Sequence, residues 1–216
     1  MIYKNEIAEI IASYLLEIKA IKLNNKDPFT WASGLRSPIY CDNRVALSYP
    51  DKRSYIKLQL ANVVKDYFSD VDVIAGVATA GIPQGVLVAE ELGLPFVYVR
   101  SSAKAHGMTN KIEGHLEKGQ KVVVVEDLIS TGKSSLAAVD ALRDSGAVVA
   151  GMIAIFTYGL DIAEKNFIDK DCKMIALSDY NAMIKKAVGE SYVTKEDEMS
   201  LLEWRKDPKQ WSQDNE

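Results

Sequence analysis

Short apolar runs, each separated from the next by a stretch long enough for a helix, constrain the fold more than any other feature of this sequence. They lie at residues 71–77, 95–100, 121–127, 147–156 and 173–179. Valine and isoleucine are frequent in these runs, and apolar residues do not alternate with polar ones, which is typical of strands covered on both faces. The sequence therefore predicts an α/β fold of doubly wound type, with a central parallel sheet flanked by helices. Ligands of such sheets bind at the carboxyl ends of the strands.

Helical periodicity frames these strands. Apolar residues recur at helical spacing over residues 3–20 and 51–68, which predicts two amphipathic helices. Near the C-terminus a surface helix is predicted to open at Thr194, where Asp197 completes a variant of the capping box. This helix is predicted to end before Pro208.

Length and composition narrow the class of protein. With 216 residues, the chain is expected to form a single domain over residues 1–216. The net charge of -4 gives no general attraction for nucleic acid or an anionic membrane. No stretch approaches the roughly 20 apolar residues that span a bilayer. The two cysteines, Cys41 and Cys172, have neither zinc-ligand nor CxxC spacing, so a reducing cytoplasm is the expected location.

The stretch VVVVEDLISTGKSS, residues 122–135, carries the strongest chemical signal. Glu126 and Asp127 stand side by side at the end of a predicted buried strand, where like charges repel each other unless a ligand binds both. Backbone N–H groups of the following STGKSS segment can hold a phosphate at the start of a helix. The two carboxylates suit ribose hydroxyls or a magnesium ion instead. The motif therefore predicts a ligand that combines a sugar with a phosphate.

Two other interpretations of this motif remain open. The acidic pair could be merely solvated, and the hydroxyl residues could merely cap a helix. The letters GKS also match the end of the nucleotide-binding P-loop, G-x-x-x-x-G-K-[ST]. However, Asp127 occupies the position of the first glycine of that motif, which argues strongly against a P-loop.

The same stretch resembles the signature of the type I phosphoribosyltransferases, in which a hydrophobic strand runs into two acidic residues and a phosphate loop. The resemblance implies that family's fold and a site for 5-phosphoribosyl 1-pyrophosphate (PRPP). It implies that the acidic pair contacts the ribose hydroxyls, and that Mg²⁺, held mainly by PRPP, lies near the pair directly or through water. The loop would hold the 5′-phosphate. The implied PRPP-binding residues are Glu126, Asp127, Ser130, Thr131, Gly132, Lys133, Ser134, Thr79, Ala80 and Gly81.

The last three of these residues belong to GVATAGIP, residues 76–83, at the end of the first predicted strand. In the family the matching loop binds pyrophosphate through backbone amides, sometimes with a non-proline cis peptide bond. This chain lacks the lysine that some members carry there, so the backbone is expected to do more of the binding. An ordinary strand-to-helix turn, which is the alternative, uses the same residue types.

The segment FTWASGLRSPIYCDNR, residues 29–44, narrows the resemblance to the family members whose base is orotate. It looks like the segment that those enzymes lay over orotate, and we call it the hood. The hood and the N-terminal helix together would take up residues 1–45 approximately. The implied orotate-binding residues are Phe29, Ser37, Tyr40, Arg44 and Ser130.

One branch of these enzymes places a lysine where this chain has Ala32. Arg44 is therefore expected to replace it as the cation for the orotate carboxylate, because a guanidinium can bind a carboxylate through two hydrogen bonds. The alternative is that Arg44 pairs with a nearby acid such as Asp42.

The segment RSSAKAHGMTNKIEGHL, residues 100–116, is long and polar for a connection between two strands. It resembles the family's flexible catalytic loop, which is supplied across the interface of a homodimer. The implied catalytic residues are Arg100, Lys104 and His106, whose positive charge would stabilise the leaving pyrophosphate. Many members carry a second basic residue where this chain has Ser101. A solvated surface loop is the alternative.

Together these segments imply transfer of the phosphoribosyl group from PRPP to orotate, with Mg²⁺, in pyrimidine biosynthesis. Two other functions remain open. One is a phosphoribosyltransferase for another base, such as a purine, and the hood argues against it. The other is a regulator that keeps the PRPP site without catalysis, and the complete set of Arg100, Lys104 and His106 argues against that.

Overall fold

The computed structural model describes residues 1–31, 34–101 and 111–215. Six strands of the described part form the central sheet: β5 (Val73–Val77), β6 (Phe96–Val99), β7 (Ile112–Glu113), β8 (Lys121–Ile129), β9 (Val148–Thr157) and β10 (Met174–Asp179). Their order is β10-β9-β8-β5-β6-β7, and only the β6–β7 pair within this sheet is antiparallel. The five predicted strands and their parallel arrangement are confirmed. Strand β7, which was not predicted, is too short to give a periodic pattern.

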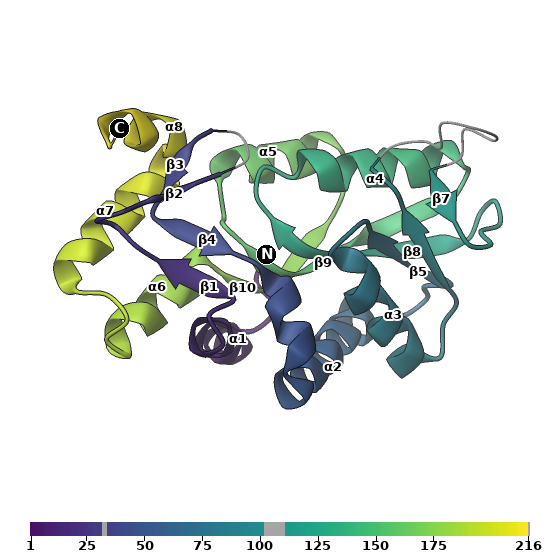
Figure 1. Ribbon diagram of the computed structural model, residues 1–216. Helices are drawn as coiled ribbons and strands as arrows, with labels where there is room; N and C mark the ends of the chain where they lie inside the picture. The colour runs from purple at the N-terminus through teal and green to yellow at the C-terminus, as the bar shows by residue number, and fades with distance from the viewer. Residues whose placement is uncertain (32–33, 102–110, 216) are drawn as a thin grey trace.

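Helices cover both faces of this sheet (Figure 1). One face carries α1 (Asn5–Glu17), α2 (Pro50–Tyr67) and α3 (Gly81–Leu92), and the other carries α4 (Lys133–Asp144) and α5 (Asp161–Asp169). The valines of β8, residues 122–125, have no exposed surface because helices lie above and below them. This explains why the strand reads as an unbroken apolar run.

The first helix is shorter than the sequence predicted. Residues 3–20 show helical periodicity, but α1 begins at Asn5 because the residues before it pair with the edge of the sheet. Tyr3 N donates to Ala176 O at 3.0 Å, and Ile2 forms a parallel bridge with Ala176. These hydrogen bonds partly cover the edge of β10, which would otherwise expose unpaired backbone groups.

The hood is built from short strands, which the sequence did not predict. Its elements and their neighbours are β1 (Ile21–Leu23), β2 (Phe29–Thr30), β3 (Arg36–Ser37), β4 (Ile39–Cys41) and the 3-10 helix η1 (Asn43–Ser48). Strand β1 pairs with β4, and β2 pairs with β3, both antiparallel. Strands of two or three residues are fixed by these pairings and leave no local signal in the sequence.

Three helices complete the chain: α6 (Tyr180–Gly189), α7 (Lys195–Lys206) and α8 (Pro208–Asp214). The predicted capping box between Thr194 and Asp197 is present, and α7 ends before Pro208 as predicted. However, α7 is more than a surface helix, since Leu201 and Trp204 on it are fully buried. Helix α8 packs against β3 of the hood (Figure 1).

The strand order changes direction between β5 and β8. From β5 the chain goes to β6 and β7 on one side, then returns to place β8, β9 and β10 on the other side of β5. In open α/β sheets, ligands bind at the carboxyl ends of the strands at such a switch point. The turns after β5 and β8 are therefore the place to look for a site.

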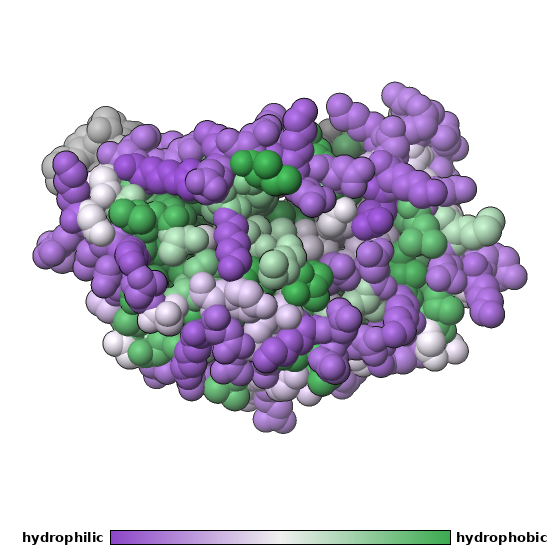
Figure 2. All heavy atoms as spheres, turned by 180° about the vertical axis from the view of Figure 1, so that it is seen from behind, coloured by the Kyte–Doolittle hydropathy of each residue, from purple (hydrophilic) through white to green (hydrophobic). Residues whose placement is uncertain are grey.

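No helix of the described part of the chain is both long and apolar enough to cross a bilayer. The face opposite to that of Figure 1 is largely hydrophilic, and its apolar residues form separate patches rather than a continuous band (Figure 2).

Candidate functional site

The turn after β5 lies against the end of β8. Gly81 opens α3 so close to β8 that a Cβ atom on it would collide with the carbonyl oxygen of Val125. Glycine is therefore required there for close approach of the two backbones. The Ala78–Thr79 peptide bond is cis, and Ala78 N donates to Val99 O at 2.8 Å. The predicted pyrophosphate turn, which includes Thr79, Ala80 and Gly81, thus lies beside the predicted ribose-binding strand.

The acidic pair lies within β8, which continues to Ile129, two residues beyond the predicted end of the strand. Glu126 is only 6% exposed. Its Oε2 accepts a hydrogen bond from Ser135 Oγ at 3.0 Å, and its Oε1 accepts one from Asp127 N at 3.1 Å. Ser135 was not among the predicted site residues, although it lies in the same quoted stretch, because its contact with Glu126 requires α4 to fold back over the end of β8.

Burial makes this pair of carboxylates costly to ionise. It raises the pKa of Glu126 to about 8, and the neighbouring Asp127 carboxylate adds to the shift. Burial also raises the pKa of Asp127. Such a pair gains from a ligand that brings hydrogen-bond donors or positive charge, so the environment favours sugar hydroxyls or a cation over a bare phosphate.

The donor chemistry of the pair suits Mg²⁺. Carboxylate oxygens are the ligands that this ion prefers, and it commonly takes only one or two from the protein and the rest from substrate phosphates and water. Within the described ranges, no group of three or more His, Cys, Asp or Glu residues is arranged to hold a metal. Glu126 and Asp127 would therefore hold the ion only together with oxygens of the substrate.

The loop after β8 has the features of a phosphate site. Gly132 caps α4 with a φ of 76°, in the left-handed region that favours glycine. Lys133 and Ser134 form the first turn of α4, whose N–H groups have no partner within the helix. Helix α5 fixes the loop, because Asn166 Nδ2 donates to Thr131 O at 2.9 Å. The predicted residues 130–134 are thus brought together at a helix N-terminus, where anions bind.

Asn43 connects the hood to the acidic pair. Its side chain is fully buried, and its Nδ2 donates to the backbone carbonyl of Asp127 at 2.7 Å. The thiol of Cys41 donates to Asn43 Oδ1 at 3.4 Å. Asn43 lies in the quoted hood segment but was not predicted as a site residue. Its role depends on a contact with a residue 84 positions away, which no local pattern reveals.

A cavity of about 530 Å³ lies between the hood and the carboxyl ends of β8 and β9. Its wall is mainly apolar and aromatic, which suits a flat ring. Of the residues predicted to bind orotate, Tyr40 and Ser130 line it, whereas Phe29, Ser37 and Arg44 do not. The full lining is Thr30, Trp31, Leu35, Tyr40, Cys41, Leu128, Ser130, Thr131 and Tyr158. Trp31 and Tyr158 were not predicted, although Tyr158 directly follows β9, where the strand-end rule could have found it.

Phe29 and Ser37, which were also predicted to bind orotate, both have contacts within the hood. Phe29 packs near Tyr40, with 5.8 Å between ring centroids. Ser37 is 1% exposed, and its hydroxyl donates to Ile39 O at 3.0 Å within the hood. Binding of a base by Ser37 stays a prediction.

Arg44 forms the ion pair that was considered as the alternative to orotate binding. Its Nε and Nη2 donate to the two oxygens of Asp42 at 2.6 and 2.8 Å, and this lowers the pKa of Asp42. The Arg44 side chain is nevertheless 57% exposed, and exposed ion pairs are weak. Breaking the ion pair with Asp42 to bind another carboxylate therefore costs little free energy. Binding of a base by Arg44 stays a prediction.

Of the predicted catalytic residues, only Arg100 lies in the described part of the chain. Its Nη1 lies 3.4 Å from Glu113 Oε1 on β7, and its backbone N–H donates to Lys111 O at 2.8 Å. Lys104 and His106 lie outside the described residues. Their roles stay predictions.

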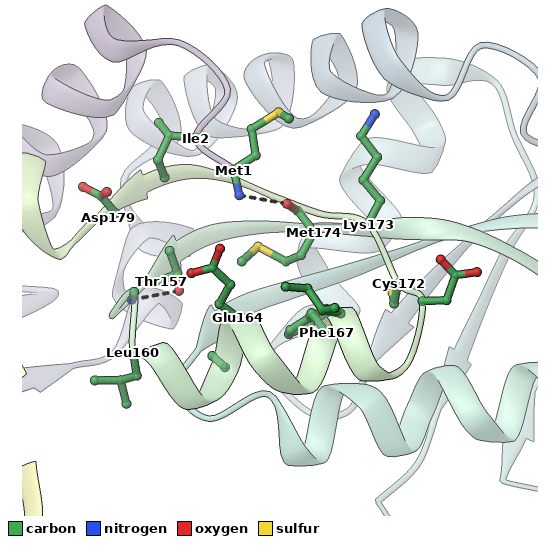
Figure 3. Close-up of a pocket in the computed structure, with 14 residues that line it drawn as sticks. Met1, Ile2, Thr157, Leu160, Glu164, Phe167, Cys172, Lys173, Met174 and Asp179 are labelled. Carbon is green, nitrogen blue, oxygen red and sulfur yellow. Dashed lines mark hydrogen bonds between the residues drawn. The ribbon is translucent and has the colours of Figure 1, made fainter. Parts of the chain in front are cut away.

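A second hollow of about 530 Å³ lies between α5 and β10, near the N-terminus (Figure 3). Met1 donates from its amino group to Met174 O there, and Glu164 projects from α5 towards the hollow. None of the residues predicted to bind PRPP or orotate lines it. The residues predicted to bind PRPP lie instead at the ends of β5 and β8, and those predicted to bind orotate lie in the hood, apart from Ser130.

Comparison with known proteins gives a consistent picture. The family model described as phosphoribosyl transferase domain matches residues 56–193. The chain is 55% identical over 205 residues to an orotate phosphoribosyltransferase of Porphyromonas gingivalis, which covers 95% of this chain and 98% of that protein.

Solved structures agree at lower identity. A Leishmania donovani UMP synthase is similar with a TM-score of 0.76 and 26% identity, covering 92% of this chain, which spans only 42% of that protein. An orotate phosphoribosyltransferase from Aeropyrum pernix is similar with a TM-score of 0.74 and 27% identity, covering 85% of this chain and 99% of that one.

Proposed function

Because this chain belongs to the type I phosphoribosyltransferase family, we propose that it transfers the phosphoribosyl group of PRPP to orotate, giving orotidine 5′-monophosphate and pyrophosphate in pyrimidine biosynthesis. One observation carries the proposal. The acidic pair, the phosphate loop and the hood lie together at the switch point of the sheet. The hood resembles the segment that orotate enzymes lay over their base, which argues against a purine. The identity of 55% to an orotate enzyme over most of the chain supports the same base.

Each part of PRPP has a counterpart in the site. The loop of residues 130–134 receives the 5′-phosphate, because its N–H groups and the positive end of α4 point out of the helix. Glu126 and Asp127 accept hydrogen bonds from the ribose hydroxyls. The turn of Thr79, Ala80 and Gly81 receives the pyrophosphate through its backbone.

The reaction itself is a displacement at C1 of the ribose. A ring nitrogen of orotate forms a bond to C1 and loses its proton to water or to the departing pyrophosphate. The C1–O bond breaks at the same time, and its electron pair leaves with pyrophosphate. The protein's contribution is to hold the two substrates in line and to stabilise the charge that develops on the leaving group. No residue of the described part is required to form a covalent bond with the substrate.

Mg²⁺ belongs to this proposal as the expected cofactor. When bound, it would neutralise charge on the pyrophosphate as the C1–O bond breaks. Glu126 and Asp127 fit the ion as two oxygen donors, directly or through water, with PRPP supplying most of its other ligands. Because burial raises the pKa of Glu126 to about 8, binding of a cation beside it near neutral pH is expected to release a proton from Glu126.

The base would lie in the cavity between the hood and the ends of β8 and β9. Tyr40 and Ser130 would supply a ring contact and a hydroxyl from the wall of the cavity, with Phe29 packed against Tyr40. Arg44 would exchange Asp42 for the orotate carboxylate. The Ser37 side chain is engaged within the hood, and its backbone pairs with Phe29 in the β2–β3 ladder, so binding of the base by Ser37 stays a prediction. The remaining apolar wall excludes water from a planar ring.

The proposal extends to a homodimer in which the loop of residues 100–116 completes the site of the neighbouring subunit. Arg100, Lys104 and His106 would then contact the leaving pyrophosphate. We expect the enzyme to work in the cytoplasm, with small-molecule substrates and without nucleic acid or membrane partners. The two free cysteines, Cys41 and Cys172, agree with a reducing compartment.

A panel of bases tests the reaction. Purified protein, PRPP and MgCl₂ are mixed with orotate, hypoxanthine, guanine, xanthine or uracil, and orotate is followed by its absorbance. We expect orotate to be consumed in preference to the others, and consumption to stop when EDTA removes the metal. Preference for a purine would replace orotate as the substrate, and no turnover of any base would favour a regulator that binds PRPP.

A mixing experiment tests the shared loop. Chains inactivated by Lys104→Ala are mixed with chains inactivated by Asp127→Ala, and hybrid dimers are quantified by native mass spectrometry. If the loop acts in trans, each hybrid has one site with both changes and one with neither, so activity returns to about half that of a wild-type dimer. Hybrids without activity would place Lys104 in its own subunit's site.

A further inference from the structure

A buried aromatic cluster connects the C-terminal helices to the cavity between the hood and the ends of β8 and β9. Trp31 of the hood stacks on Tyr158, with 5.4 Å between ring centroids, and both rings line the cavity. Trp204 of α7 meets each of them edge to face, at 5.6 Å from Trp31 and 5.5 Å from Tyr158. Trp204 is fully buried, so it forms the layer directly behind these two walls.

Other contacts hold α7 and α8 in this place. Tyr180 packs on Trp204 at 5.2 Å, and its hydroxyl donates to Leu201 O at 3.0 Å. Helix α8 is tied to the hood because Ser212 Oγ accepts a hydrogen bond from Arg36 N at 2.9 Å. The strand pair β2–β3 is thus held between the cavity and the C-terminal helices.

The walls of the cavity come from two parts of the fold that do not pair with each other in a sheet. Trp31 follows β2 in the hood, whereas Tyr158 follows β9 in the central sheet. Trp204 touches both rings. A change in its size or position therefore changes the width of the cavity without touching the acidic pair or the phosphate loop.

On this basis we propose that Trp204 is a positioning residue for the base: it sets the spacing of Trp31 and Tyr158, and so makes the C-terminal helices part of the base site. The proposal rests on the proposed function only for the identity of the base. It predicts that changes at Trp204 affect recognition of the base far more than recognition of PRPP.

Trp204 can be replaced without loss of a side-chain hydrogen bond to the described residues. Its Nε1 is buried and has no hydrogen-bond partner among the described residues, so Trp204→Phe removes ring volume and ring contacts but no hydrogen bond. Trp211 of α8 provides the matched control. It is also buried, at 6% exposure, and its Nε1 donates to Ser200 Oγ at 3.1 Å, but its ring has no contact with Trp31 or Tyr158 in the aromatic pairs of the structure.

The experiment compares the two substitutions in the full chain. The KM for orotate and the KM for PRPP are measured for wild type, Trp204→Phe and Trp211→Phe, well below the melting temperature of each. We expect Trp204→Phe to raise the orotate KM about 10-fold, because aromatic pairs contribute beyond their buried area, and to leave the PRPP KM within about 2-fold. Trp211→Phe loses a hydrogen bond as well, yet should leave the orotate KM unchanged.

The remaining outcomes are decisive as well. Equal changes in both KM values, an equal effect of Trp211→Phe, or no change at all would overturn the proposal. If Trp204→Phe does not fold, Tyr180→Phe tests the same cluster, because it keeps the ring beside Trp204 and removes only the bond to Leu201 O of α7; an unchanged orotate KM would then count against the proposal. If wild type prefers another base in the panel, the proposed function fails, and the same KM comparison with that base still tests Trp204.

Discussion

Substitution of Asn43 should separate the folding of the hood from the placement of the acidic pair. Asn43→Ala removes the donor to Asp127 O at 2.7 Å and leaves a small void at a position with no exposed surface. Loss of a buried hydrogen-bond partner costs about 2 kcal/mol. For a chain of this length, a melting temperature falls by roughly 2–4 °C per kcal/mol, so we expect a decrease of about 4–8 °C.

Asn43→Ala should also lower the catalytic efficiency, because it removes the hydrogen bond that holds the backbone of Asp127. If the lost interaction were expressed fully in the transition state, kcat/KM for PRPP would fall by roughly 30-fold, since about 1.36 kcal/mol corresponds to a factor of ten. We therefore expect a decrease between about 5-fold and 30-fold for PRPP. Steady-state kinetics with PRPP varied at saturating orotate measure it, alongside thermal denaturation followed by circular dichroism.

Ser178→Ala is the matched control. Ser178 is also fully buried, and its Oγ donates to the backbone carbonyl of Ala8 at 2.7 Å, but this bond joins β10 to α1, away from the acidic pair. It should lower the melting temperature to a similar extent and leave kcat/KM for PRPP near the wild-type value. If Asn43→Ala lowers the melting temperature but leaves kcat/KM for PRPP unchanged, Asn43 serves folding alone and the reasoning is refuted.

Three further predictions concern charge, backbone and base recognition. Because burial raises the pKa of Glu126 to about 8 from an ordinary 4.5, the folded chain binds that proton more tightly than the unfolded chain. Its contribution to the free energy of unfolding is then full below pH 4.5 and is lost as pH rises from about 4.5 to 8. Without PRPP, the melting temperature should therefore fall over this pH range, and Glu126→Gln should make it depend less on pH. Gly132→Ala places a Cβ 2.7 Å from Phe167 Cε2 at a φ of 76°. It should lower stability by about 1–2 kcal/mol and raise the PRPP KM, measured by urea denaturation and steady-state kinetics, and an unaltered PRPP KM would argue against the phosphate loop. Arg44→Ala should raise the orotate KM by roughly 30- to 150-fold with little change for PRPP, whereas Asp42→Asn should lower it or leave it unchanged; equal effects on both substrates would remove Arg44 from the base site.

The sequence alone determined the central sheet, and it also predicted the proposed phosphate end of the site. Strands covered on both faces require unbroken apolar runs. Residues 71–77 and 121–127 could therefore be predicted as strands without knowing which strands and helices they contact. The acidic pair and the loop that follows it are contiguous, and the chemistry of a helix N-terminus is local. For that reason Glu126, Asp127 and Gly132 were identified from the same short stretch, and the structure places them together at the end of β8.

Tertiary structure alone decided how the base end of the site is assembled. Asn43 contacts Asp127 across 84 positions of sequence, and Trp204 contacts Trp31 from the far end of the chain. Whether Arg44 pairs with Asp42 also depends on the fold of η1, where the Asp42 side chain accepts from Arg44 N. These contacts join elements whose own patterns are short or irregular, and no periodicity encodes which of them will meet. Local propensity and apolar spacing fix the strands and helices, whereas packing of the hood and the C-terminal helices against the sheet fixes the cavity.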